Sequence, residues 1–168
     1  MWQDIKFQGG IIHIIDTVLT IPASDSATAV AAGLTSLASA LNATSLISTV
    51  NGLKDVTIFG PSNAAFGAIS SALGSLSASQ ITSILTYHVV AGTVGYSSLL
   101  SNTTLKTVNG GSVTITVENG SMFVNSAKVI IPDVLVANGV VHVIDKYDTA
   151  PHSSPSPGVP FHVQHANN

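Results

Sequence analysis

The sequence predicts an α+β fold, with helices in the first half of the chain and strands in the second. Apolar residues recur every three or four positions between Val30 and Leu41, which is typical of a helix with one buried face. From Thr103 onward apolar and polar residues alternate instead, which is typical of strands. A run of helices followed by a run of strands indicates an α+β domain rather than alternating α/β units.

The composition narrows the classes of function. Only 8% of the 168 residues are charged and the net charge is −3, without a Lys or Arg cluster that would indicate nucleic-acid binding. The chain contains no cysteine, which excludes disulfides, thiolate chemistry and Cys-based zinc sites. No apolar run approaches the roughly 18 residues of a membrane-spanning helix. No signal peptide is visible after Met1.

The first helix is expected to begin at Ser24 or Asp25, both of which are good N-cap residues. A second short helix is expected over residues 44–50, ended by Gly52. The apolar positions assigned to one face of the first helix are Val30, Leu34, Leu37 and Leu41.

A strand is expected over residues 56–59, because Gly60 and Pro61 break the pattern that precedes them. The next helix carries Phe66, which we expect to be buried against the first helix. Residues 77–80 read Ser-Ala-Ser-Gln, a capping box that opens a helix over residues 78–89.

The second half predicts an antiparallel meander. An Asn-Gly pair at residues 119–120 accepts the positive φ of a hairpin turn. Pro132 and Asp133 are expected to turn the chain before the final strand. The strands are expected at residues 105–108, 113–117, 122–124, 128–131 and 140–144.

A short motif occurs twice. Residues 10–16 read Gly-Ile-Ile-His-Ile-Ile-Asp and residues 139–145 read Gly-Val-Val-His-Val-Ile-Asp. Their spacing of 129 residues, from His13 to His142, is about one domain length. We therefore expect residues 1–21 to be the last strand of a preceding domain or an N-terminal extension, residues 22–148 to form one domain, and residues 149–168 to be a Ser/Pro-rich tail.

Three motifs in order resemble the fasciclin domain family. Residues 57–66 read Thr-Ile-Phe-Gly-Pro-Ser-Asn-Ala-Ala-Phe and resemble its first signature, with Gly60 where Ala is usual. Residues 139–145 resemble its second signature, and residues 85–92 resemble its Tyr-His segment. The resemblance implies a wedge-like β-sandwich with N-terminal helices packed along the sheet edge. It also implies tandem copies and extracellular adhesion.

The resemblance implies two partner-binding segments. One is Tyr87 with His88, and the other is Pro132, Asp133, Val134 and Leu135. The residues themselves favour structural roles: a packed Tyr or His with a hydrogen-bonded tip, and an Asp133 that accepts backbone donors in a turn. His13 and His142, in apolar runs, are interpreted as structural, and no metal site is expected.

Three sequons fit the acceptor pattern for N-glycosylation, and they begin at Asn42, Asn102 and Asn119. Together with the low charge they favour a secreted glycoprotein, located extracellularly or at the cell surface. The Ser-, Thr- and Asn-rich composition resembles fungal or microbial fasciclin proteins more than animal ones.

The sequence carries no Gly-x-Ser-x-Gly elbow, no His-Glu-x-x-His motif and no phosphate-binding glycine loop. We interpret the chain as a non-catalytic adhesion module without a cofactor. Its partner would be a cell-surface or matrix protein or a cell-wall polysaccharide, with a small apolar ligand as a further option. The alternative, from family resemblance alone, is a small-molecule binder or an auxiliary enzyme that acts on secreted metabolites.

Overall fold

The computed structural model describes residues 4–15, 18, 21–22, 24–69 and 73–147. The predicted tail at residues 149–168 therefore lies outside the described residues, as does Asp16. The helices are α1 (Asp25–Ala31), α2 (Thr35–Ala43), α3 (Ile47–Gly52), α4 (Asn63–Ala68) and α6 (Ala78–Tyr87). The strands are β1 (Asp4–Phe7), β2 (Gly10–His13), β3 (Val56–Pro61), β4 (Val89–Val90), β5 (Thr103–Lys106), β6 (Ser112–Glu118), β7 (Ser121–Val124), β8 (Ala127–Val136) and β9 (Gly139–Ile144).

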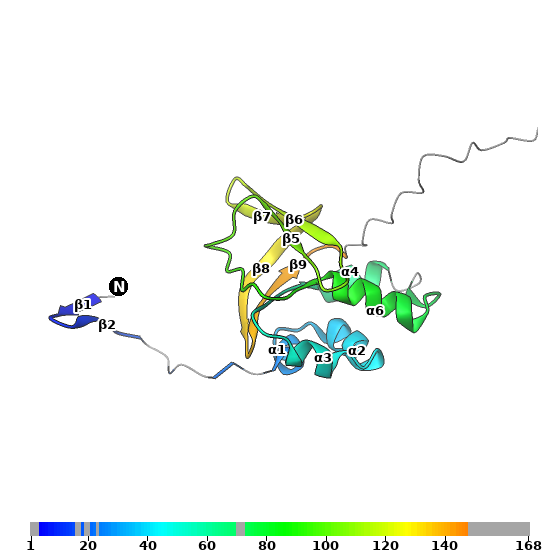
Figure 1. Ribbon diagram of the computed structural model, residues 1–168, viewed down its shortest axis with the longest axis horizontal. Coiled ribbons are helices and arrows are strands. Elements are labelled where there is room, and N and C mark those ends of the chain that lie inside the picture. The colour runs from blue at the N-terminus through cyan, green and yellow to red at the C-terminus, as the bar shows by residue number, and fades with distance from the viewer. Residues whose placement is uncertain (1–3, 16–17, 19–20, 23, 70–72, 148–168) are drawn as a thin grey trace, which may run out of the picture.

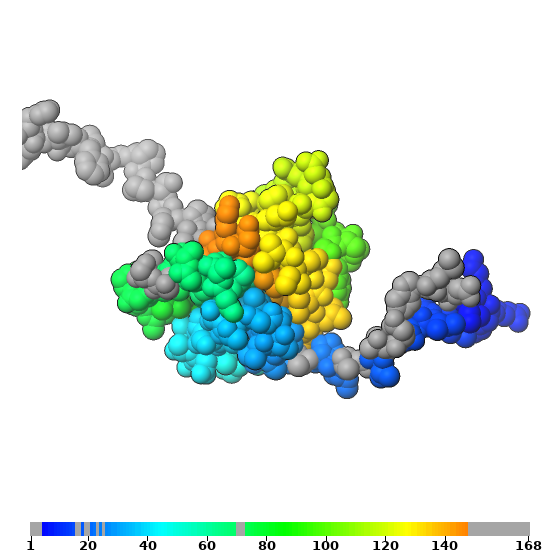
Figure 2. Space-filling view, turned by 180° about the vertical axis from the view of Figure 1, so that it is seen from behind, coloured from blue at the N-terminus to red at the C-terminus, as the bar shows by residue number. Residues whose placement is uncertain are grey.

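The domain is built on a seven-stranded sheet with the strand order β4-β3-β9-β8-β7-β6-β5. The last strand, β9, lies between β3 and β8; it runs parallel to β3 and antiparallel to β8. The predicted strands at residues 56–59 and 140–144 are therefore neighbours in one folding unit, which confirms the α+β prediction. Helices α1–α3 lie on one side of β3 and β9, and strands β5–β7 lie on the other side (Figure 1, Figure 2).

Two apolar clusters hold the layers together. One lies between the helices and the sheet and includes Leu37, Phe66 and Val141. The other lies inside the bend of the sheet, where Phe59 and Ile144 from its middle meet Ile115 from β6. Both faces of β9 are consequently buried, which explains why its sequence is a continuous β-branched run rather than an alternating one.

The predicted first helix is two helices. Gly33 has φ +76°, a left-handed conformation that ends α1, and α2 starts again at Thr35. The change of direction leaves Val30 56% exposed, whereas Leu34, Leu37 and Leu41 are buried as expected. The placement of Val30 on the buried face was therefore wrong.

Other predicted boundaries also shift: α3 begins at Ile47 rather than at residue 44 and includes Gly52, and β5 covers Thr103–Lys106 rather than residues 105–108. Strand β8 continues through Pro132 and Asp133 instead of turning there, because an irregularity in its pairing with β9 between Ile131 and Val134 accommodates them. Asp133 takes the left-handed φ of +59° inside this β8 bulge. The helix at residues 78–89 ends at Tyr87, and Val89 instead pairs with Ile58 of β3.

The contact between β9 and β3 requires a glycine. A Cβ built on Gly139 would lie 1.9 Å from the carbonyl oxygen of Val56, so no other residue fits without moving the backbone. The glycine of the repeated motif is thus explained by the strand beside it.

The N-terminal segment forms a separate antiparallel hairpin of β1 and β2, which pairs with none of the other described strands. It lies away from the seven-stranded sheet (Figure 1). Phe7 is 55% exposed and Ile12 is 51% exposed.

Candidate functional site

Tyr87 lies in the core and not on the surface. It is 1% exposed, its hydroxyl donates to the backbone oxygen of Ser112 at 2.9 Å, and the Asn125 amide donates to that hydroxyl at 3.0 Å. Tyr87 thereby ties the end of α6 to strand β6 and the β7–β8 turn. Contact with a partner would require the end of α6 to move, so a partner-binding role for Tyr87 stays a prediction.

His88 is also enclosed. It is 4% exposed, its Nδ1 lies 2.8 Å from the carbonyl oxygen of Ile84, and its ring centroid is 5.0 Å from that of Tyr147. A void of about 20 Å³ adjoins His88 between the helices and the sheet. A space of this size holds at most a water molecule, so it offers no room for an organic ligand. A partner-binding role for His88 likewise stays a prediction.

The polar residues of the first signature motif, Ser62 and Asn63, make hydrogen bonds within the domain. The Ser62 hydroxyl caps α4 by accepting from the Ala65 N–H at 3.2 Å. The Asn63 amide donates to the carbonyl of Gly33 at 2.7 Å and so holds the α1–α2 turn against α4. These contacts account for the residue types without a ligand.

Asp133 and His142 belong to one hydrogen-bond network that joins three segments. The carboxylate of Asp133 accepts from the Ser97 N–H at 2.8 Å and from the Ser97 hydroxyl. The Asp133 N–H donates to Nδ1 of His142 at 3.3 Å, and the other ring nitrogen of His142 bonds the carbonyl of Gly95 at 2.7 Å. The network therefore fastens the loop at residues 93–97 to β8 and β9.

Thr57 completes this attachment from β3. Its hydroxyl donates to the carbonyl of Thr93 at 2.8 Å and accepts from the Gly95 N–H at 2.7 Å. Because Thr57 and His142 are both fully buried, these bonds are shielded from water. Buried groups therefore hold the loop at Thr93 and Gly95, and the partly buried Asp133 holds its other end at Ser97.

Two groups of the network, His142 and Asp133, have lowered pKa values. Burial lowers the pKa of His142, and this effect exceeds the opposing influences of the Gly95 carbonyl and the Asp133 charge. Burial raises the pKa of the Asp133 carboxyl, but the two Ser97 hydrogen bonds and the His142 charge outweigh it, so that the net pKa is lowered. Both shifts thus favour a neutral His142 ring beside an ionised Asp133 carboxylate.

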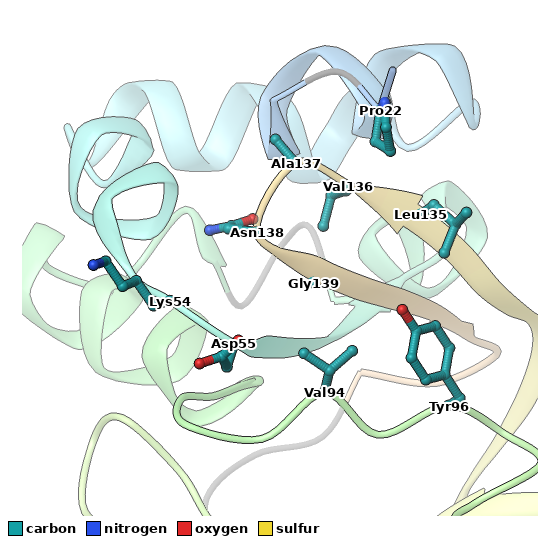
Figure 3. A pocket seen from close by; sticks show the side chains of 10 residues that line it. All are labelled: Pro22, Lys54, Asp55, Val94, Tyr96, Leu135, Val136, Ala137, Asn138 and Gly139. Atoms are coloured by element: carbon teal, nitrogen blue, oxygen red, sulfur yellow. The ribbon is translucent and has the colours of Figure 1, made fainter. Parts of the chain in front are cut away.

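An open groove of about 490 Å³ runs along the outer side of this loop. It is formed by the α3–β3 connection, the loop at residues 93–97 and the β8–β9 turn. Figure 3 shows Tyr96 and Leu135 at one end and Lys54 with Asp55 at the other. Its lining residues are Pro22, Lys54, Asp55, Val94, Tyr96, Leu135, Val136, Ala137, Asn138 and Gly139.

The groove, termed here the 54–96–138 groove after Lys54, Tyr96 and Asn138, offers several kinds of contact. Tyr96 is 37% exposed and Leu135 is 52% exposed, so apolar surface is available at one end. The amide nitrogen of Asn138 donates to the carbonyls of Val50 and Leu53 at 3.0 and 3.1 Å. Its Oδ1 is buried and accepts no hydrogen bond from the described residues.

The four residues of the second predicted binding segment, residues 132–135, have different surroundings. Pro132 is exposed, and Asp133 is committed to Ser97. Val134 is partly buried against the helix-side cluster, and Leu135 reaches the 54–96–138 groove. Leu135 is therefore the member of the six predicted partner-binding residues that combines exposure with a concave surface.

The three candidate glycosylation sites are exposed. Asn42 lies near the end of α2, and the Asn102 side-chain oxygen accepts from the Val117 N–H at 2.8 Å. Asn119 occupies the tip of the β6–β7 hairpin with φ +50°. Among the described residues no group of three or more His, Asp or Glu side chains could hold a metal ion. Across the same residues, none of the helices has the length and apolar character for crossing a membrane.

Sequence reasoning missed Lys54, Asp55, Tyr96 and Asn138 as groove residues. They come from three separate segments, and no shared spacing connects them. The one local sign is Asp55, whose φ of +53° marks a tight connection before β3.

Comparisons with known proteins agree with this architecture. Residues 32–147 match the family model of the fasciclin domain. The chain is 38% identical over 161 residues to a fasciclin-like arabinogalactan protein of Arthroderma benhamiae, covering 91% of this chain and 38% of that protein. It is 38% identical over 120 residues to the immunogenic protein MPB70 of Mycobacterium bovis, covering 67% of this chain and 61% of that protein.

The fold also matches a solved structure of a FAS1 domain pair from the insect cell adhesion molecule fasciclin I. The TM-score is 0.65 at 21% identity, over 86% of this chain and 57% of that chain. The chain spans about two fifths of the length of the fungal relative. The chain belongs to the fasciclin domain family.

Proposed function

We propose that the chain is a non-catalytic extracellular interaction module that binds a cell-surface, matrix or cell-wall partner through the 54–96–138 groove. The observation that carries the proposal is the exposure of Tyr96 and Leu135 beside hydrogen-bonding groups in one concave surface. The names of the similar proteins, a fasciclin-like arabinogalactan protein and a cell adhesion molecule, support an extracellular setting.

The groove suits a largely neutral partner. Tyr96 offers an aromatic ring with a hydroxyl, and Lys54 and Asp55 offer charges of opposite sign. Opposite charges side by side give little net field at a distance, so they would position a partner more than attract it. A polysaccharide or a polar protein loop presents hydroxyl and amide groups that can form hydrogen bonds with the Tyr96 hydroxyl.

The proposal is tested by measuring binding of the chain to cell-wall polysaccharides and matrix proteins. We expect Tyr96→Ala and Leu135→Ser each to weaken binding about fivefold to thirtyfold, which corresponds to about 1–2 kcal/mol. The affinity should change little between low and physiological salt, because few charges take part.

Leu99→Ser is the matched control, because Leu99 is 75% exposed and does not line the groove. Leu135→Ser and Leu99→Ser should melt close to the parent chain, since more than half of each side chain lies in solvent, and the binding of Tyr96→Ala is measured below its own melting transition because Tyr96 is 37% exposed. Equal affinity of the Tyr96 and Leu135 variants and the parent for a partner would place the contact elsewhere.

The reading as a small-molecule binder or auxiliary enzyme receives less support from the geometry. The space beside His88 is about 20 Å³, and the larger groove is open to solvent. A metabolite whose turnover is abolished by Tyr87→Phe, with the fold intact, would replace the adhesion proposal.

A further inference from the structure

His142 is a titratable ring that the loop at residues 93–97 covers on one side. The ring is fully buried in β9, and the ring of Phe59 stacks on it at a centroid distance of 5.8 Å. Its Nε2 is bonded to the Gly95 carbonyl of the loop at 2.7 Å, and its Nδ1 lies 3.3 Å from the N–H of Asp133. Both ring nitrogens are thus used, and the contacts fit the neutral form.

The same loop forms one wall of the 54–96–138 groove. Val94 and Tyr96 line the groove, and Figure 3 shows both side chains directed toward it from the loop. Gly95 lies between them in sequence and places its carbonyl on His142. Neighbouring residues of one short loop therefore contact the groove and the ring, so the position of the groove wall depends on the contact with His142.

The loop is attached by individual hydrogen bonds and not by strand pairing, because residues 93–97 form no helix or strand. The Thr57 hydroxyl holds Thr93, and the Asp133 carboxylate holds Ser97. The N–H of Thr93 also donates to the carbonyl of Asp55. An irregular segment held in this way opens at a lower free energy than the central strands β3 and β9 beneath it.

A proton on the ring conflicts with the closed arrangement. A protonated Nδ1 is a donor, and it would face the Asp133 N–H, which is also a donor. The new charge would also lie in a fully buried site, where water cannot solvate it. Phe59 of β3 and Gly95 of the loop bring no ionisable group to the ring. The charge that acts on the ring from β8 is the Asp133 carboxylate, which is already bonded to Ser97.

The direction of the pH dependence follows from this conflict. Burial lowers the pKa of His142, so the closed loop binds the proton less readily than an open loop whose ring meets water. The preference for the closed loop is complete above about pH 6.5, the ordinary pKa of histidine, and is lost as the pH falls toward the folded value. The ratio of open to closed loop should rise by up to about tenfold per pH unit in this range.

We propose that His142 is a positioning residue that couples the shape of the 54–96–138 groove to pH. When the ring gains a proton, the loop at residues 93–97 releases it and carries Val94 and Tyr96 away from the groove. This role of His142 rests on the proposed function of the groove: neutral surroundings keep the wall in place for a partner, and acidic surroundings remove it.

The loop can be observed without any partner. Hydrogen exchange is measured at the Gly95 and Ser97 amides of the 168-residue chain between pH 7.5 and 5, corrected for the intrinsic pH dependence of exchange. Both amides donate inside the closed loop, to Thr57 and to Asp133. We expect their protection to fall by up to about tenfold per pH unit below about pH 6.5, while the Val141 amide in β9 stays at least about a hundredfold better protected.

His142→Gln tests the ring directly, because its amide can donate and accept but does not titrate. Protection of Ser97 in this variant should stay the same between pH 7.5 and 5. His13→Gln is the matched control, since His13 is exposed and lies in the separate hairpin of β1 and β2. It should keep the pH profile of the parent chain.

Thr57→Val tests the coupling with the ring left in place. The variant keeps the shape of the side chain but removes the hydroxyl that holds Thr93 and Gly95. Protection of Ser97 at pH 7.5 should fall about fivefold to a hundredfold, because the loop opens more easily. The titration midpoint of His142, followed by nitrogen NMR of the ring, should move upward toward 6.5. An unmoved midpoint would show that the ring takes up its proton without the loop.

Two further results would overturn the inference. One is a pH dependence of Ser97 protection that is equal in His142→Gln and the parent chain. The other is a loss of protection at Ser97 and Val141 together, which would assign proton uptake to global unfolding. The proposed function fails separately, in binding measurements at pH 7.5 where the loop is closed. Once a partner is identified, its affinity should fall below pH 6.5 for the parent chain and not for His142→Gln.

Discussion

Asp133 and His142 are joined through the Asp133 backbone: its N–H donates to Nδ1 of the ring at 3.3 Å. Nδ1 can accept only when it carries no proton, so the neutral ring carries its hydrogen on Nε2 and donates it to the Gly95 carbonyl at 2.7 Å. A bulge residue in β8 thereby selects the tautomer of a buried ring in β9. Protonation of the ring would break this arrangement.

The domain should lose stability as the pH falls below about 6.5, the ordinary pKa of histidine. Burial lowers the pKa of His142, so the unfolded chain binds this proton more readily than the folded one. The contribution is complete above pH 6.5 and is lost as the pH falls toward the folded value, with a slope of at most about 1.4 kcal/mol per pH unit. Urea unfolding between pH 7.5 and 5 measures this slope.

The matched variant is His142→Gln, whose amide can still donate and accept but does not titrate. It should be less stable at pH 7.5 and should have a flatter pH profile than the parent. An unchanged slope in this variant would assign the pH dependence to another group.

Asp133→Asn should destabilise the domain by about 0.5–1.5 kcal/mol. Asn tolerates the left-handed φ of +59° but cannot accept from both the N–H and the hydroxyl of Ser97 with the strength of a carboxylate. Denaturant unfolding of Asp133→Asn, Ser97→Ala and the double variant measures the coupling between the two residues. Additive losses would show that the contact contributes nothing of its own.

Phe66→Ala should cost about 3–5 kcal/mol, because Phe66 is buried in the helix-side cluster and its ring centroid lies 5.7 Å from that of Tyr147. Tyr147→Phe should instead be neutral or stabilising. The Tyr147 hydroxyl is buried without a partner among the described residues, and burial raises its pKa well above the usual range. Thermal and denaturant unfolding of the two variants checks both directions, and a loss below about 1 kcal/mol for Phe66→Ala would contradict its placement.

Expression in a glycosylating host should place a glycan on Asn119. Its side chain is exposed at a hairpin tip, where an enzyme can approach from several sides. Ser121→Ala removes the sequon but keeps Asn119 in its φ +50° conformation, and should lower the mass by one glycan. An unchanged mass would show that the site is unused.

Local signals in the sequence were sufficient where one short segment determines the structure. The Ser77–Gln80 capping box forms as expected, because both of its hydrogen bonds lie within four residues. The three signature motifs identified the family, since they reflect buried strands and caps. The break at Gly33 was missed because the apolar spacing continues across it, although the chain changes direction there.

The candidate site depends on contacts that no spacing encodes. Pro132 is a usual turn residue, but pairing with β9 keeps it inside β8. The 54–96–138 groove joins segments more than 30 residues apart, and its shape follows from how Thr57 and His142 hold the loop at residues 93–97. Such a surface can be recognised in the folded structure but not in the spacing of residues along the sequence.

The position of β9 has a consequence for synthesis on the ribosome. The last strand of the sheet, β9, lies in its interior between β3 and β8. Strand β3 therefore cannot pair with its parallel neighbour until a segment about 80 residues later in the sequence has been synthesised. Until residues 139–144 have emerged, β3 and the helices that pack on it lack their covering strand and expose apolar surface. Folding of this unit is therefore expected to be late and slow, and a nascent chain stalled before Gly139 should be held by chaperones.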